Sequence, residues 1–341
     1  MVRLAAVIMA VVAVGAIWSL TFRADAPTEG VNGSIFASGS STVEPVTLIV
    51  SEQFHEQDPS FGYQVEGPGT GDGFALFCNG ETDLNNASRP IQPSEVETCA
   101  ANGVAFVELL VAYDGLTVIT AAANDAIDCL SFLDLYALLG PESQGVRTWT
   151  DADALAGELA SDLGEAFGAS GVPYPAGDLV ITAPGEESGT FDTFVEIVIA
   201  PIADERGTDH TTRPDYVASP NDNVILEGIA GTTTSLGWVG MAFAEESSGF
   251  VRQLEIDGGS GCVAPSDEAV ADGSYPISRP LFVYVNLGRA AGSEALRAFI
   301  DFYVSDAGLG SAPEVGYVEL TAEQAAETRA AWDGALAEMG P

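Results

Sequence analysis

Residues 34–45 read Ser34-Ile-Phe-Ala-Ser-Gly-Ser-Ser-Thr-Val-Glu-Pro45, a short apolar strand that passes through a polar turn into a helix near 43–57. The same pattern returns at Leu179–Thr182, where an apolar strand precedes Glu187-Ser-Gly-Thr190 and a helix near 191–200. Strands that alternate with helices in this way are typical of α/β folds with parallel strands. The sequence therefore predicts an α/β protein with parallel-rich sheets flanked by helices.

Two extended apolar segments, Tyr113–Thr120 and Pro280–Val285, have the character of strands that pass between two lobes. The chain of 341 residues is long enough for two cores of roughly 150 residues each. We expect one lobe of residues 31–112 plus 284–341 and a second of residues 113–283, joined by a two-strand hinge that lets them close on a ligand. The alternative is a single long domain in which both segments are ordinary core strands.

The N-terminus has the features of an export signal. Arg3 precedes an apolar run from Leu4 to Phe22, and Ala24-Asp-Ala26 resembles a cleavage site. We expect residues 1–26 to be a signal peptide, although a run of this length could also remain as a membrane anchor. The mature protein is then expected in the periplasm or on the extracellular face of the cytoplasmic membrane.

The cysteine content fits that location. An even number of cysteines in an exported chain suggests two disulfides, and spacing alone leaves three pairings open. A zinc site is not expected, because no Cys-x-x-Cys pair occurs, and we predict no cofactor. The four cysteines are Cys78, Cys99, Cys129 and Cys262.

The charge is strongly negative, with 11 basic residues against 50 acidic ones and a formal net charge of −39. All the basic residues are arginines. Nucleic acid and anionic lipid are therefore poor partners, and the simplest interpretation is a solvated acidic surface. An anion is also repelled at long range, although salt screens this field beyond about 10 Å. Any anion site must act through local geometry.

The first candidate loop contains the hydroxyls of Ser40, Ser41 and Thr42. It follows a strand and precedes a helix, so the free backbone N–H groups and the positive end of the helix dipole can face an oxyanion. Ser41 and Glu44 also fit a capping box, which would make the loop a helix cap with nothing bound.

The second candidate is the glycine-rich stretch Gly67–Phe74, which precedes a short helical pattern. Its glycines let the backbone approach a ligand closely, and Thr70 could donate its hydroxyl. An ionised Asp72 would repel a bare anion but could accept a hydrogen bond from protonated phosphate, and it would disfavour sulfate. The alternative is an exposed Asp72 that caps a helix.

Two further loops carry the same chemistry. Arg89, in Asn85–Pro90, has a guanidinium that suits tetrahedral oxyanions, although an ion pair is the competing interpretation. Ser188, Gly189 and Thr190 form a strand-to-helix turn in which Ser188 is the expected N-cap. Four loops of one chemical kind, spread over both expected lobes, favour an anion-binding protein.

Enzymatic functions have less support. The chain has only two histidines and no Gly-x-Ser-x-Gly elbow, so a Ser-His-Asp triad has little material. A Walker loop requires a lysine, and no pair of carboxylates stands out as an acid and base. We therefore expect a protein without catalytic residues.

Five motifs occur in an order that resembles the PstS-type phosphate-binding proteins of phosphate ABC importers, especially their SphX-like branch. The resemblance extends over about residues 31–320. The motifs are Gly39-Ser-Ser-Thr-Val43, Gly69-Thr-Gly-Asp-Gly-Phe74, Ala87-Ser-Arg-Pro-Ile91, Ser188-Gly-Thr-Phe-Asp192 and Ser278-Arg-Pro-Leu-Phe282.

The resemblance implies a type II periplasmic-binding-protein fold that holds inorganic phosphate in the cleft between its lobes and delivers it to ABC permease subunits. It also implies disulfides between Cys78 and Cys99 and between Cys129 and Cys262, and we expect a monomer. The implied ligands are Ser41 and Thr42 with adjacent amides, Thr70, Arg89, Ser188, Gly189 and Thr190.

Some features depart from that family. Glycine is commoner there where this chain has Asp72, so the role of this side chain does not follow from the resemblance. The remaining alternatives are a binding protein for sulfate, molybdate or tungstate, an exported phosphatase, and a surface-anchored phosphate sensor.

Overall fold

The structure, a computed structural model, describes residues 31–247 and 249–340. The expected signal peptide, residues 1–26, lies outside the described residues. Within them, strands and helices alternate along most of the chain, as the sequence pattern predicts.

The central sheet of the fold is mixed and contains nine strands. Eight follow the order β2-β1-β3-β12-β4-β8-β6-β7, and β9 pairs with β4. Its outer ladders are parallel, whereas β12 and β4 pair antiparallel to each other and to their neighbours. The strands are β1 (Gly33–Gly39), β2 (Phe61–Glu66), β3 (Leu84–Ala87), β4 (Phe106–Ala121), β6 (Val180–Ala183), β7 (Val217–Ala218), β8 (Ser235–Gly240), β9 (Val251–Gln253) and β12 (Ser278–Asn286).

A second sheet contains three short strands in the order β11-β10-β5. These are β5 (Cys129–Ser131), β10 (Glu255–Asp257) and β11 (Cys262–Val263).

Helices cover the sheets. The α-helices are α1 (Glu44–Gln57), α2 (Thr70–Cys78), α3 (Pro93–Ala101), α4 (Phe132–Leu139), α5 (Asp153–Phe167), α6 (Gly189–Phe194), α7 (Ala200–Arg206), α8 (Asp222–Ala230), α9 (Met241–Glu246), α10 (Asp267–Ala271), α11 (Leu287–Gly292), α12 (Glu294–Tyr303), α13 (Asp306–Leu309) and α14 (Ala322–Met339). A π-helical turn, η3 (Val195–Ile199), joins α6 to α7, and three short 3₁₀ turns are η1 (Pro141–Ser143), η2 (Trp149–Ala152) and η4 (Ala312–Val315).

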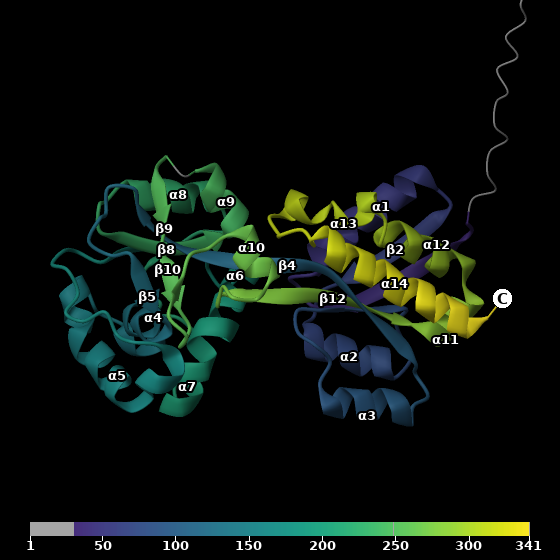
Figure 1. The fold of residues 1–341 in the computed structure, drawn as a ribbon, viewed down its shortest axis with the longest axis horizontal. Coiled ribbons are helices and arrows are strands. Elements are labelled where there is room, and N and C mark those ends of the chain that lie inside the picture. Colours follow the sequence, from purple (N-terminus) through teal and green to yellow (C-terminus); the bar gives the residue numbers. More distant parts are fainter. Residues whose placement is uncertain (1–30, 248, 341) are drawn as a thin grey trace, which may run out of the picture. The chain divides into compact units, whose positions relative to one another are not determined.

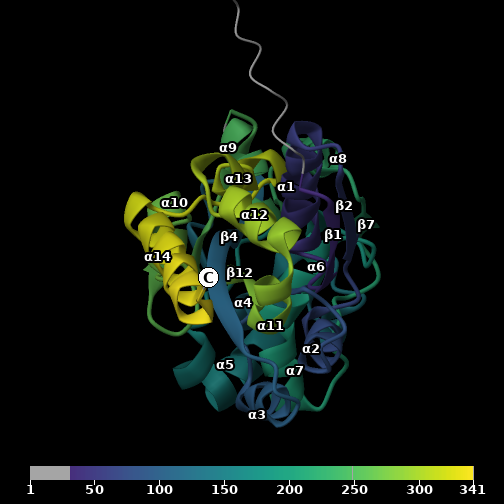
Figure 2. The same cartoon turned by 90° about the vertical axis from the view of Figure 1, so that its right-hand side faces the viewer.

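The long strands β4 and β12 run side by side through the middle of the fold, with α4, α5 and α7 at one end and α1, α2 and α12 at the other (Figure 1). In the view turned by 90°, α14 and α12 lie on one side of these strands and α2 lies on another (Figure 2). Helix α14 packs on β4, and α12 and α2 pack on β1. The two-lobed α/β fold expected from the sequence is confirmed.

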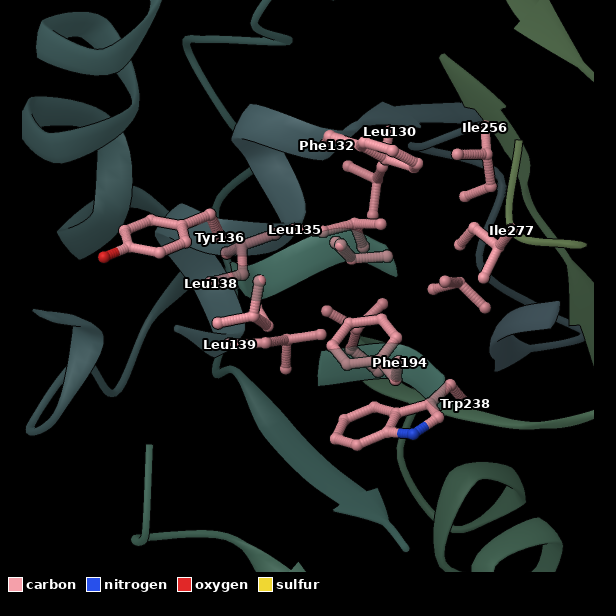
Figure 3. Close-up of a cluster of buried hydrophobic side chains, with 14 of the residues drawn as sticks. Leu130, Phe132, Leu135, Tyr136, Leu138, Leu139, Phe194, Trp238, Ile256 and Ile277 are labelled. Atoms are coloured by element: carbon pink, nitrogen blue, oxygen red, sulfur yellow. The ribbon is translucent and has the colours of Figure 1, made fainter. Parts of the chain in front are cut away.

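The hydrophobic core forms two large clusters, one in each half of this arrangement. One gathers around α4, which is buried along its whole length, and it includes the stacked rings of Phe194 and Trp238, whose centroids lie 4.2 Å apart (Figure 3). The other gathers around Phe54, Phe299 and Trp332. Burial of large apolar side chains is the main stabilising contribution in both.

The change from one core to the other occurs along β4 and β12. Ala112 packs in the second cluster and Leu116 in the first, while Ile277 packs in the first and Leu281 in the second. These positions lie near the boundaries predicted for the lobes. The division into residues 31–112 plus 284–341 and residues 113–283 stays a prediction.

Both disulfides implied by the family resemblance are present, Cys78–Cys99 and Cys129–Cys262. The first joins α2 to α3, and the second joins β5 to β11. None of the helices in the described residues combines the length and apolar character needed to cross a membrane.

Candidate functional site

A pocket of about 270 Å³ lies where several strand ends and helix starts meet. Because β1 and β3 are parallel neighbours, the segments that follow them lie at the same edge of the sheet. Side chains from the other half of the fold complete the pocket through α6, η3 and β12. Its lining residues are Ser40, Ser41, Thr42, Gly69, Thr70, Gly71, Ser88, Arg89, Asp192, Glu196 and Arg279.

The turn between β1 and α1 brings three predicted hydroxyls, those of Ser40, Ser41 and Thr42, to the pocket. The Ser40 N–H donates to the Asn86 carbonyl at 2.8 Å, which fixes the turn against β3. Residues Ser40 and Thr42 are buried, and Ser41 is exposed. Burial of two hydroxyls at a helix start provides a rigid polar surface for an anion.

The expected capping box of Ser41 and Glu44 is wrong. The helix begins at Glu44 with Val43 as N-cap, and no side chain caps it. The pattern placed the N-cap at Ser41, but the turn continues through Thr42 and Val43 before the helix starts at Glu44. The Ser41 hydroxyl is therefore not used as the cap of α1.

The start of α2 lies against the same turn. The Gly69 N–H donates to the Gly39 carbonyl at 2.8 Å, and the hydroxyls of Thr70 and Ser88 lie 3.2 Å apart. A Cβ on Gly73 would lie 2.4 Å from the Cα of Gly39, so the two segments approach too closely for any side chain there. Thr70 thus lies in the first helical turn and is directed toward the end of β3.

Asp72, unlike Thr70, does not line the pocket. It lies two residues further along the same turn of α2, is exposed, and is not among the residues that line the pocket. The N-cap of α2 is Gly69, so Asp72 is not the cap either.

Arg89 lines the pocket and forms an ion pair at the same time. Its guanidinium donates to both carboxylate oxygens of Glu95, at 2.8 and 2.9 Å, and its Cζ lies 5.6 Å from the centre of the Phe74 ring. The hydrogen bond to Glu95 raises the pKa of Arg89. Although burial opposes it, the Arg89 and Gln92 hydrogen bonds hold the pKa of Glu95 below its usual value. The pair orients a cation that remains partly exposed to the pocket.

Arg279 is the second cation of the pocket. It lies on β12 and is 8% exposed. Its Nη2 donates to the hydroxyl of Thr42 at 2.8 Å and to that of Thr193, and its Nε donates to Asp114 at 3.3 Å. Its Nη1 donates to Glu196 at 2.5 Å. The side chain thus contacts both halves of the fold, through the turn after β1 and through α6 and η3.

Asp114 orients Arg279 through their ion pair. This carboxylate on β4 is buried, and it also accepts a hydrogen bond from Thr193 at 2.9 Å. Burial raises the pKa of Asp114, against the opposing effect of Arg279. A buried carboxylate with two donors is costly to leave unpaired, so Asp114 fixes the guanidinium in place.

Two carboxylates, Asp192 and Glu196, face the same pocket from α6 and η3. Partial burial raises the pKa of Asp192, while Arg279 acts in the opposite direction and Glu196 adds to the rise. Asp192 and Glu196 are separated by four positions in a continuous helical run. Residues at this spacing share a face of a helix, so both side chains lie on the same side.

The fourth predicted loop lies beside the pocket but is not among its lining residues. Ser188 is the N-cap of α6, as expected, and its hydroxyl accepts from the Thr190 N–H at 3.2 Å. A Cβ on Gly189 would lie 3.9 Å from the hydroxyl of Thr42. The start of α6 therefore lies next to the turn after β1. In the described ranges, no three His, Cys, Asp or Glu side chains are grouped to hold a metal ion.

Comparison with known proteins identifies the family. Residues 24–307 match the model of the PBP superfamily domain. The chain is 35% identical to Protein SphX from Synechocystis sp. over 85% of this chain and 79% of that protein. It is 27% identical to the Phosphate-binding protein PstS of Staphylococcus saprophyticus over 88% of this chain and 85% of that protein.

Solved structures of similar fold agree with this family assignment. A possible phosphate-binding protein from Planctomyces limnophilus has a TM-score of 0.79 and 29% identity, over 90% of this chain and 100% of that chain. PstS from Borrelia burgdorferi, at 19% identity, 84% of this chain and 99% of that chain, has a TM-score of 0.61 and supports the fold. The chain therefore belongs to the PBP superfamily, among the relatives of SphX.

Proposed function

We propose that this protein binds inorganic phosphate outside the cytoplasm and delivers it to the membrane subunits of a phosphate ABC importer. One observation carries the proposal: two of the eleven basic residues of this acidic chain, Arg89 and Arg279, line one small pocket with the hydroxyls of five residues. Guanidinium groups and hydroxyls suit a tetrahedral oxyanion. The name of one relative, the Phosphate-binding protein PstS of Staphylococcus saprophyticus, supports the same ligand.

The proposed ligands include the predicted residues Ser40, Ser41, Thr42, Thr70 and Arg89. Arg279 is added, because its guanidinium faces the pocket. The start of α6 is proposed to reach the anion when the two halves close, through the Gly189 N–H and the hydroxyls of Ser188 and Thr190.

Selectivity is proposed to depend on Asp192. An ionised carboxylate only accepts hydrogen bonds, so it favours an oxyanion that carries a proton, as phosphate does, over sulfate. Asp72, which the sequence suggested for this role, is exposed outside the pocket and receives no part in the proposal. Deprotonated oxyanions are then expected to bind more weakly.

A binding role is proposed, without catalysis. The PstS relative carries the name of a phosphate-binding protein, and among the described lining residues there is neither histidine nor cysteine. Two disulfides agree with an oxidising compartment. The monomeric state and the docking of a closed form on permease subunits belong to the same proposal.

Isothermal titration tests this function. Purified protein should release or absorb heat on addition of phosphate, with one site and tighter binding than for sulfate or molybdate. Absence of any heat or thermal protection by phosphate would refute the proposal. Release of p-nitrophenol from its phosphate ester, on a time scale of minutes, would indicate a phosphatase instead.

A further inference from the structure

The contacts of Arg279 differ in how easily each can be exchanged. Three partners are buried: Asp114, Thr42 and Thr193. The fourth, Glu196, has a side chain that is 56% exposed, and its contact with Nη1 is the 2.5 Å ion pair. Only this last partner can move into solvent without stranding a buried group of its own, provided that the anion takes its place on Nη1.

The helix that carries Glu196 directs it to this position. Residues 189–206 form one helical run in which the π-helical turn η3 follows α6 and precedes α7. A π-helical turn changes the register of the side chains that follow, and such turns are frequent at functional sites. Glu196 lies within this turn and lines the anion pocket together with Asp192.

The charges around the pocket make the contact significant. Arg89 is already paired with Glu95, and Arg279 is paired with both Asp114 and Glu196. Every guanidinium that lines the pocket therefore carries a carboxylate partner before an anion arrives. An oxyanion that reaches Nη1 of Arg279 must compete with Glu196 for the same donor.

We propose that Glu196 is a displaceable counter-ion of Arg279, which occupies Nη1 in the free protein and leaves it when the anion binds. This inference rests on the proposed phosphate site. Glu196 lowers the affinity for the anion, because binding must first break an ion pair. It also promotes release, because a departing anion is replaced at once by a tethered carboxylate. In the free protein it satisfies an otherwise unpaired donor of Arg279.

The test is Glu196→Gln, which keeps the size of the side chain and removes its charge. Phosphate should bind about two- to fivefold tighter, the range expected when a partly exposed ion pair no longer competes. Sulfate should gain by the same factor, since displacement of a counter-ion does not depend on a ligand proton. Stopped-flow measurement should show that phosphate dissociates more slowly.

A matched control is Glu205→Gln, which removes one charge from the exposed face of α7 in the same helical run. It should change affinity less than twofold, so that a loss of general repulsion is distinguished from a loss of the ion pair. Glu196→Ala provides a second variant, and its melting temperature reports whether the fold is intact.

Three results would overturn the inference. Weaker phosphate binding by Glu196→Gln would show that Glu196 contacts the ligand favourably, and an unchanged affinity would show that it does not compete. A gain for sulfate alone would indicate that Glu196 accepts a ligand proton. If the unmodified protein bound no phosphate in the same titrations, the proposed function itself would fail, which is a separate outcome.

Discussion

Replacement of Arg279 by glutamine separates binding from folding. Arg279→Gln leaves Asp114 buried without its cationic partner, and an uncompensated buried charge costs about 3–5 kcal/mol of stability. The single variant is therefore expected to be strongly destabilised. Arg279→Gln combined with Asp114→Asn removes both charges, and it should recover most of that free energy of unfolding.

Phosphate binding should not recover with stability. Hydrogen bonds to charged groups contribute about 1.5–3 kcal/mol each, so loss of the Arg279 donor to the anion should weaken binding roughly 10- to 150-fold. The contacts of Arg279 are consistent with this loss, because Nη1 donates to the exposed Glu196, whereas the other nitrogens contact the buried Asp114, Thr42 and Thr193.

Urea denaturation and isothermal titration measure the two effects on the same samples. Asp114→Asn alone is the control, since it keeps the guanidinium and removes the group that orients it. A double variant that is stable and binds phosphate within about twofold of the unmodified protein would refute the assignment of Arg279 as a ligand.

Three other predictions concern single residues. Asp192→Asn should narrow the preference for phosphate over sulfate in a competition titration, whereas Asp72→Asn should leave that ratio unchanged; the opposite pattern would return proton recognition to Asp72. Hydrogen bonds from Arg213 lower the pKa of Asp215 to about 2, and its side chain is 36% exposed. The Asp215 carboxylate therefore contributes stability above pH 3.8 that is lost as the pH falls through 2. Asp215→Asn should lower the free energy of unfolding, measured by urea denaturation, by about 1 kcal/mol at pH 7 and by progressively less below pH 4. An equal loss at every pH would contradict this prediction. Gly73→Ala should lower the melting temperature and weaken phosphate binding together, because its Cβ would lie 2.4 Å from Gly39; binding at full strength would show that the turn after β1 can move.

The first three candidate loops could be predicted because their information is local. The turn after β1 joins a strand to a helix within a few residues. Because β1 pairs in parallel with both β2 and β3, the segments that follow the three strands bring Thr42, Thr70 and Arg89 to one edge. The role of Asp72 could not be predicted in the same way. A shift of two residues along a helix turns a side chain by more than half a circle, so Thr70 faces the pocket and Asp72 does not.

Arg279, which lines the pocket, was not among the predicted site residues, although its motif was part of the family resemblance. Its partners Thr42, Asp114, Thr193 and Glu196 lie 237, 165, 86 and 83 residues away in sequence, so no local pattern shows them. One signal was available. An arginine at the start of a largely apolar strand is a candidate for burial, and a buried guanidinium requires polar partners.

The central claim is that phosphate binds in this pocket between Arg89, Arg279 and the hydroxyls of the turn after β1. A crystal structure of the protein with phosphate tests it most directly. The account predicts a dehydrated anion within hydrogen-bonding distance of Arg279 Nη1 and of Thr42 and Thr70, with Glu196 moved away from the guanidinium. Phosphate bound elsewhere, or bound with the Arg279–Glu196 pair intact and no contact to either arginine, would contradict the account.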